Sequence, residues 1–218
     1  MRSPVAVIGL VLLALIAVCA IFGPWLAPHD PDAQDLDHPC AGPSGAHWLG
    51  QDELGRDLAS RLIVGARASA LVGLIVVSIS VSLGVLIGLL AGYLGGAVDQ
   101  LVMRVVDILL AFPGILLAIA VAGILGPSLF NIILALSILG WTGFARLVRG
   151  QVLSLREREF VLAAKAYGAS PARIMWKHVL PNVLAPVVVQ ATFGMAGVIL
   201  AEASLSFLGL GPQDIPTW

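Results

Sequence analysis

The sequence predicts an all-α integral membrane protein, and its composition carries that prediction. Of its 218 residues, 59% are hydrophobic and only 11% are charged, and the mean hydropathy is +0.99. A soluble domain has about 25% charged residues, so the composition excludes a water-soluble enzyme. The net charge of −1 argues against a nucleic-acid-binding protein, which needs a basic face. Two cysteines are too few for a disulfide framework.

Five segments are apolar and long enough to cross a membrane. A bilayer core about 30 Å thick requires roughly 20 helical residues, and we expect helices because open strands leave backbone groups unsatisfied in lipid. The odd number of segments leads us to expect a sixth helix lost beyond the C-terminus. The expected spans are 5–26, 69–94, 105–125, 129–147 and 183–205.

The first span has an alternative interpretation as a signal peptide, because Met1-Arg2-Ser3 resembles a short basic leader region. Its apolar run is longer than the 7–15 residues typical of such leaders. We therefore expect a retained membrane helix.

Three glycines follow one face of the second expected span. Gly84, Gly88 and Gly92 are four residues apart, which places them above one another on a helix. Small residues in this arrangement let a neighbouring backbone approach closely. The pattern predicts a close helix–helix contact along this face.

The charges between the spans predict the orientation. The loop 27–65 contains seven acidic and two basic residues, whereas the segment 146–182 contains seven basic and two acidic residues. Cytoplasmic loops carry an excess of Lys and Arg, so the second segment is expected in the cytoplasm together with Arg2. The expected location is the cell membrane, multi-pass, with a cytoplasmic N-terminus, an external first loop and an external Trp218.

The cytoplasmic segment predicts a helix, a tight bend and a second short helix. Gly168 can end the first helix in a left-handed turn, Ser170 is a candidate N-cap, and Pro171 suits the first position of the next helix. We expect that helix at 172–180, ended by Leu180-Pro181. From the pattern alone it could lie on the inner leaflet or dock a soluble partner. Small helix-forming side chains precede the bend, at Ala163, Ala164 and Ala166.

These residues resemble the coupling loop of ABC importer permeases, Glu-Ala-Ala, three residues, Gly, nine residues, Ile-x-Leu-Pro. Here Ala163-Ala164, Gly168 and Leu180-Pro181 match, while Leu162 replaces the Glu and His178 the Ile. His178 narrows the resemblance to the dipeptide and oligopeptide branch. Further stretches similar to that branch are 50–57 with 65–67, 107–113 and 202–209. The chain thus resembles, over nearly its whole length, the C-type permease subunit of a dipeptide/oligopeptide ABC importer.

The resemblance implies a type I importer-like helical permease, usually of six spans, that moves di- or oligopeptides by alternating access. It implies four kinds of partner: a second, related permease; two ATP-binding domains, which are separate or fused; an extracytoplasmic binding protein; and the peptide. The chain itself would bind no cofactor. It has no Gly-x-x-x-x-Gly-Lys-Ser/Thr loop and so should bind no nucleotide, and ATP and Mg²⁺ would sit on the partner ATPases. We expect an N-terminal region 1–67 and a permease core 68–218 with the coupling loop at 148–182. The expected ATPase-coupling residues are Ala163, Ala164, Gly168, Ala169, Ser170, Arg173, Leu180 and Pro181.

Other polar residues are weaker candidates. Arg104 and Asp107 lie within pairing reach on a helix and are expected to form an ion pair at the membrane edge, with gating as the alternative. Glu202, the only acid in the fifth span, is a gate or peptide-contact candidate because ionisable groups in a membrane are costly and often functional. The external loop contributes further contact or gate candidates, namely Asp52, Glu53, Arg56 and Asp57.

Metal binding and catalysis are not expected. His29, His38 and His47 are nine residues apart, which fits no compact ligand set, and no catalytic constellation of Ser, Cys, His and Asp is present. Two alternative functions stay open: an ABC permease for nickel or another small solute, and a stand-alone secondary transporter. A secondary transporter requires broken helices at the membrane midplane. Pro113-Gly114 is the only sign of such a break in the expected spans.

Overall fold

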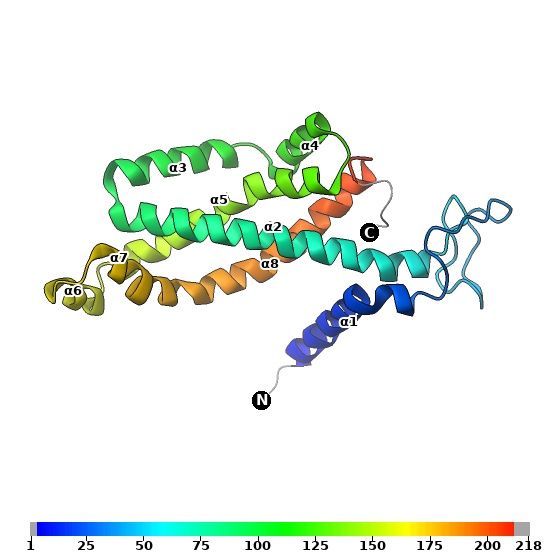
Figure 1. Ribbon diagram of the computed structural model, residues 1–218, viewed down its shortest axis with the longest axis horizontal. Coiled ribbons are helices and arrows are strands. Elements are labelled where there is room, and N and C mark those ends of the chain that lie inside the picture. The colour runs from blue at the N-terminus through cyan, green and yellow to red at the C-terminus, as the bar shows by residue number, and fades with distance from the viewer. Residues whose placement is uncertain (1–3, 212–218) are drawn as a thin grey trace. The chain divides into compact units, whose positions relative to one another are not determined.

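The computed structural model describes residues 4–211, and these are helical except in the loops that join the helices. The predicted all-α fold is confirmed: within this range the only strand-like feature is an isolated bridge between Gln51 and Asp57. In chain order (Figure 1) the helices are α1 (Pro4–Leu26), α2 (Leu58–Leu94), α3 (Gly96–Leu110), α4 (Gly114–Leu125), α5 (Leu129–Leu155), α6 (Glu159–Ala166), α7 (Pro171–Arg173), the π-helix η1 (Ile174–Val179) and α8 (Leu180–Phe207).

The chain forms two compact units, which interleave along the sequence. Within the described residues, the first unit takes the chain up to Gly73, Pro127–Leu129 and the residues from Ile199 onward. The second unit takes Leu74–Gly126 and Phe130–Val198. Helices α2 and α8 each contribute to both units, so a unit boundary here is not a boundary between successive domains.

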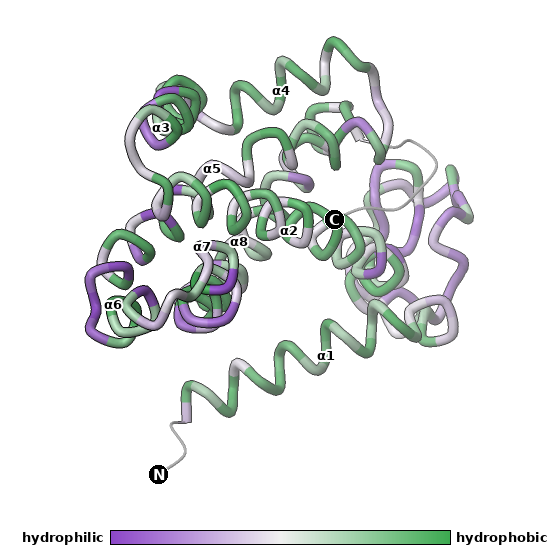
Figure 2. Tube along the Cα trace, turned by 60° about the vertical axis from the view of Figure 1, so that its left-hand side comes forward, coloured by the Kyte–Doolittle hydropathy of each residue, from purple (hydrophilic) through white to green (hydrophobic). Residues whose placement is uncertain are grey.

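Four helices within residues 4–211 are long and apolar enough to span a membrane, and a bent pair makes up to five. The four are α1, α2, α5 and the continuous run Pro171–Phe207. Figure 2 shows apolar colouring along α1, while hydrophilic residues gather in the loop after α1 and near α6. The five predicted spans therefore correspond to these helices. The second begins at Leu58 rather than at 69, the fourth ends at Leu155 rather than at 147, and the third and the fifth need further correction.

The third span is broken rather than continuous. It begins at Gly96, earlier than expected, and α3 and α4 meet at an angle of 83°. Pro113 lies at the start of α4; it has no N–H to continue a helix, and it disfavours helical backbone at Phe112. The hint at Pro113-Gly114 thus marks a true break.

The glycine face of α2 packs on α5, as predicted. A Cβ added at Gly88 would lie 2.5 Å from the carbonyl oxygen of Ala145, and one added at Gly92 would lie 2.8 Å from the Cβ of Val152. Only a hydrogen fits in that space, so the two backbones approach as the four-residue spacing requires.

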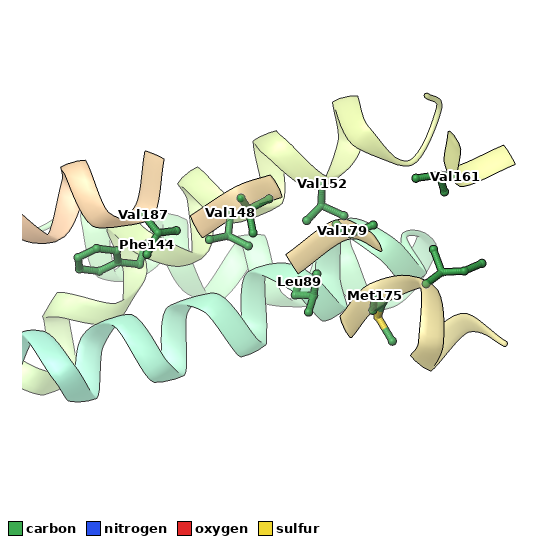
Figure 3. Close-up of a cluster of buried hydrophobic side chains, with 10 residues drawn as sticks. Leu89, Phe144, Val148, Val152, Val161, Met175, Val179 and Val187 are labelled. Carbon is green, nitrogen blue, oxygen red and sulfur yellow. The ribbon is translucent and has the colours of Figure 1, made fainter. Parts of the chain in front are cut away.

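A buried hydrophobic cluster in the second unit joins α2, α5, α6, η1 and α8 (Figure 3). Val161 from α6 and Met175 from η1 lie in the same cluster as Val148 and Val152 of α5. The short helices are therefore anchored in the helix bundle and do not form a free loop. The other members are Leu89, Phe144, Ile174, Val179, Val183 and Val187.

The expectation that a helix ends at Leu180-Pro181 is wrong. The helix beginning at Pro171 continues through η1 into α8 without interruption. In η1 the backbone hydrogen bonds join residues five apart instead of four. The N–H of Leu180 donates to the carbonyl of Met175, five residues back. Pro181 has no N–H to donate to the carbonyl four residues back. The wider π-helical turn accommodates this missing hydrogen bond, so the proline does not end the helix.

Candidate functional site

The tight bend of the coupling loop (residues 148–182) is a glycine-terminated helix end. Gly168 has φ +77°, the left-handed region. The N–H of Ala169 donates to the carbonyl of Ala164 (3.0 Å), and the N–H of Gly168 donates to that of Lys165 (2.9 Å). These two bonds define a Schellman motif, which satisfies the last carbonyls of α6. The predicted bend is confirmed.

The helix after the bend begins as predicted. The Ser170 side chain accepts a hydrogen bond from the N–H of Arg173, and Pro171 occupies the first turn. Ser170 thus caps one of the free N–H groups of the helix start. The bend and the cap together fix the direction in which the chain leaves α6 and enters α7.

The coupling loop presents a mixed apolar and basic surface. The Tyr167 side chain is 93% exposed, and Leu162 and Trp176 are also largely exposed. Arg173 and Lys177 are exposed as well. Large exposed apolar and aromatic side chains are candidates for contact with a partner. Tyr167 and Trp176 were not among the predicted coupling residues; the signal for them in the sequence is large aromatic side chains beside a basic helix.

The predicted coupling residues divide between this surface and the core. Ala163, Gly168, Ser170 and Arg173 are exposed, as is Pro181 within α8. The remaining three, Ala164, Ala169 and Leu180, are half-buried and pack against the hydrophobic cluster.

Two polar contacts connect the coupling loop to the end of α2. The guanidinium of Arg156 donates to the carbonyl of Gly92 (3.2 Å). The ammonium of Lys165 lies 5.7 Å from the centre of the Tyr93 ring, within the range of a cation–π interaction. Together with Val161 and Met175 in the core, these contacts attach the coupling loop to the helix bundle.

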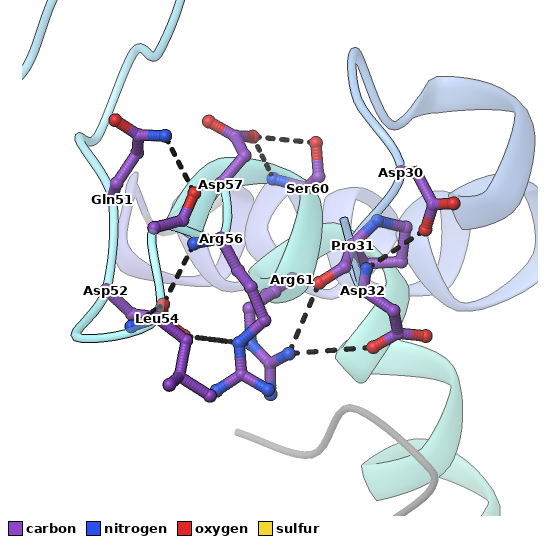
Figure 4. A network of polar contacts seen from close by, with 11 residues as sticks. Asp30, Pro31, Asp32, Gln51, Asp52, Leu54, Arg56, Asp57, Ser60 and Arg61 are labelled. Atoms are coloured by element: carbon purple, nitrogen blue, oxygen red, sulfur yellow. Dashed lines mark hydrogen bonds and ion pairs between the residues drawn. The ribbon is translucent and has the colours of Figure 1, made fainter. Parts of the chain in front are cut away.

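The first loop (residues 27–57) is ordered around Asp52 (Figure 4). Its carboxylate accepts hydrogen bonds from the N–H groups of Leu54 and Arg56 (both 2.9 Å) and from the Arg56 guanidinium (2.7 Å). Arg61 of α2 donates to the carbonyl of Pro31 (3.2 Å). The predicted candidates Asp52 and Arg56 thus pair with each other, whereas Glu53 is exposed.

Asp57 lies at the start of α2 and is almost fully buried. Its Oδ2 accepts hydrogen bonds from the N–H (2.8 Å) and the hydroxyl (2.6 Å) of Ser60. His47 Nδ1 lies 2.9 Å from Oδ1, and His29 Nδ1 lies 3.8 Å from Oδ2. Burial would raise the pKa of Asp57, but the bonds from Ser60 and His47 outweigh burial and lower it.

The nine-residue spacing of the histidines was a poor guide to their positions. The loop folds back so that His29 and His47 meet over Asp57, with ligand atoms of all three within 4.8 Å of one another. Distance along the chain says little about distance in a long loop. His38 lies apart and pairs with Asp35 (3.0 Å).

The first loop is expected to open at low pH. Burial raises the pKa of Asp52, but the hydrogen bonds from Arg56 and Leu54 outweigh it, and the pKa lies below the usual 3.8. The stabilisation of the folded loop by ionised Asp52 is therefore present above pH 3.8 and is lost as the pH falls through the pKa of Asp52 in the folded state. Hydrogen exchange of a peptide covering 45–60 should show protection lost only below about pH 4.

The control variants separate this carboxylate from its neighbour. We expect Asp52→Asn to reduce the pH dependence and Glu53→Gln to leave it unchanged. Equal effects of the two substitutions would contradict the assignment.

Glu202 is fully buried (0% exposed). One carboxylate oxygen accepts a hydrogen bond from the hydroxyl of Ser69 in α2, and the other accepts one from Ser206 in α8, both at 2.9 Å. Residues 69 and 202 are 133 apart in sequence, so this contact joins α2 to α8 within the first unit. No sequence pattern could have identified Ser69 as the partner.

Removing a donor to Glu202 should destabilise the protein. Ser69→Ala leaves a buried carboxylate oxygen without its hydrogen bond, which costs about 1–3 kcal/mol. Thermal unfolding in detergent should show this loss. Ser204→Ala is the matched control, because the exposed Ser204 hydroxyl bonds only to its own helix, at Leu200. An unchanged unfolding temperature for Ser69→Ala would show that the contact contributes nothing.

The expected ion pair between Arg104 and Asp107 does not form. Asp107 pairs instead with Arg146 of α5 (2.6 Å), in an exposed contact. A second, less exposed pair also joins α3 to α5: Arg149 binds both carboxylate oxygens of Asp99 (2.5 and 2.6 Å). Helix spacing made Arg104 a plausible partner for Asp107. The arginines that pair with Asp107 and Asp99 instead lie on α5, 39 and 50 residues away along the chain, and such distant pairs leave no local sequence pattern.

Comparison with known proteins places the chain among membrane permeases. Residues 84–216 match the family described as binding-protein-dependent transport system inner membrane component. Residues 1–43 match the N-terminal TM domain of oligopeptide transport permease C.

Three relatives illustrate the similarity. A dipeptide transport system permease protein of Alkalihalophilus pseudofirmus is 46% identical over 218 residues, 100% of this chain and 72% of the relative. A probable D,D-dipeptide transport system permease protein of Escherichia coli is 47% identical over 212 residues, 97% and 71% of the two chains. A glutathione transport system permease protein of Shigella flexneri is 47% identical over 219 residues, 100% and 72%.

These matches agree with the several apolar helices described above. Transport permeases of this kind are non-catalytic, multi-pass membrane proteins. The chain belongs to the binding-protein-dependent inner membrane components, the permeases of ABC importers.

Proposed function

We propose that this chain is the translocation subunit of an ATP-driven importer of di- or oligopeptides, working by alternating access. The observation that carries the proposal is the coupling loop, which presents an exposed surface around Tyr167 and Trp176 yet has Val161 and Met175 in the bundle core. A partner that moves this surface also moves the helices. Peptide as cargo is supported by the names of the relatives, two of which are named as dipeptide transport system permeases.

The coupling loop is the docking site for a partner ATPase. Ala163, Gly168, Ser170 and Arg173 lie on the exposed side, and Arg173 suits an acidic rim of the partner groove. By the positive-inside rule this surface and the N-terminus face the cytoplasm. The first loop then faces outward, towards a substrate-binding protein. A second, related permease completes the pathway, with two ATP-binding domains carrying ATP and Mg²⁺.

Co-purification tests the proposal. The tagged full-length protein is purified in detergent from its native membranes, as wild type and as Gly168→Asp. We expect a second permease and an ATPase with the wild type, and weakened ATPase association and ATP hydrolysis with Gly168→Asp. Gly45→Asp is the matched control, since Gly45 lies in the first loop with open space around it.

Two outcomes would contradict the proposal in different ways. A protein that purifies without an ATPase in every sample is a stand-alone transporter. A complex that contains the ATPase but takes up no labelled dipeptide is an importer of another solute, such as a metal ion.

A further inference from the structure

The His29, His47 and Asp57 side chains form a compact set of potential metal ligands in the first loop. Their ligand atoms all lie within 4.8 Å of one another, and the centres of the two imidazole rings are 4.7 Å apart. We propose that these three side chains bind a divalent transition-metal ion of the zinc class. The site is independent of the transport function proposed above.

The distances suit such an ion. Zinc binds imidazole nitrogen and carboxylate oxygen at about 2.0–2.2 Å, so two ligands of a tetrahedral site are about 3.3 Å apart. The distances found are 2.9 Å from His47 Nδ1 to Asp57 Oδ1 and 3.8 Å from His29 Nδ1 to Asp57 Oδ2. They lie on either side of that spacing, each to a different oxygen of the carboxylate, and on binding the His29 ring would turn from Oδ2 towards Oδ1. Two nitrogens and one oxygen are a zinc-class ligand set.

The carboxylate is held in place for this role. Asp57 is 1% exposed, and both its bonds from Ser60 go to Oδ2. Ser60 also accepts a hydrogen bond from the N–H of His29 (3.0 Å), so it fixes the first histidine relative to the carboxylate. Groups that orient metal ligands in this way strengthen binding. Oδ1, on the side of His47, is left for the ion.

Binding requires a change of tautomer at His47. In the structure its Nδ1 shares a hydrogen bond with Asp57 Oδ1. On binding, the proton of the neutral His47 ring moves from Nδ1 to Nε2, and Nδ1 presents its lone pair to the ion, so the ion replaces the hydrogen bond. No proton is released from a neutral ring, and water completes the coordination.

The surroundings permit a cation to enter. The His29 and His47 side chains are 40% and 25% exposed, so an ion reaches them from solvent. The N-terminus of α2 disfavours a cation, but the Asp57 carboxylate offsets it at the same position. The neighbouring Arg56 is paired with Asp52 (2.7 Å). The bound ion would link two parts of the first loop, at His29 and His47, to Asp57 at the start of α2.

Zinc titration of the purified full-length protein tests the proposal. The protein carries an affinity tag without histidines and is stripped with a chelator, and binding of Zn²⁺ is measured by calorimetry. Co²⁺ replaces Zn²⁺ in a second titration, because the intensity of its visible absorption reports the coordination number. We expect one ion per chain and a spectrum of low coordination number, together with a higher unfolding temperature when the ion is present.

Matched histidine variants decide which residues bind. We expect His29→Gln to weaken binding by about tenfold or more, and His38→Gln, a change in the same loop at an exposed histidine, to leave it unchanged. His29 is the preferred variant because its ring makes no close hydrogen bond in the folded loop. A wild type that binds no Zn²⁺, or equal binding by His29→Gln and the wild type, would overturn the proposal.

Discussion

Gly168→Val is expected to abolish coupled transport while the protein remains inserted in the membrane. At φ +77° an ordinary residue costs roughly 1–2 kcal/mol, and a β-branched one costs more. No atom lies within 4 Å of an added Cβ, so the strain comes from the backbone alone. Relieving it breaks the Schellman turn and redirects α7. Uptake of a labelled dipeptide should fall about tenfold or more, the factor that roughly 1.4 kcal/mol produces.

The asparagine variant controls for the added side chain. Asparagine tolerates the left-handed conformation better than other residues, so Gly168→Asn should retain most of the uptake. The amount of protein in the membrane should be equal in both variants. Uptake at the wild-type level with Gly168→Val, or an equal loss with Gly168→Asn, would show that the backbone conformation is not what matters.

Gly88→Ala is expected to separate α2 from α5 and to lower the free energy of unfolding. The added methyl would lie 2.5 Å from the carbonyl oxygen of Ala145 and 3.0 Å from the Cβ of Val148. The first of these is backbone and cannot turn aside, so one helix must shift. Overpacking of this kind costs about 1–3 kcal/mol, and here the shift also disturbs the cluster that holds the coupling loop. Thermal unfolding in detergent and uptake should both fall.

Gly143→Ala in α5 is the matched control. Nothing lies within 4 Å of an added Cβ at Gly143, and alanine favours a helix by about 1 kcal/mol over glycine. The same substitution should therefore be neutral or slightly stabilising there. If both variants unfold like the wild type, the contact between α2 and α5 is looser than the structure indicates.

The features that could be predicted are those that depend on the spacing of residues close together in the sequence. The Gly84, Gly88 and Gly92 face, the left-handed turn at Gly168 and the cap at Ser170 all depend on residues within a few positions of one another. The break at Pro113 also follows from local sterics, though its angle of 83° does not. Such features are governed by backbone geometry, which a sequence pattern carries directly.

The features that escaped prediction depend on contacts across the chain. Asp107 finds Arg146 rather than Arg104, and Glu202 finds Ser69, because helix packing brings distant residues together. The meeting of His29 and His47 depends on the path of a long loop. One sequence contains no information on which of several equally suitable partners is near. The helix junction at Leu180-Pro181 was missed because a proline was expected to end a helix, whereas a π-helical turn accommodated it.

That π-helical turn changes the rotational phase of the helix that it interrupts. One residue of an α-helix turns the chain by about 100°, so an extra residue in η1 offsets every side chain before Ile174 by about that angle relative to α8. Arg173 therefore does not lie on the face of α8 that a periodic count from Val183 assigns to it. A deletion of one residue within η1 would therefore rotate the entire bend against the bundle.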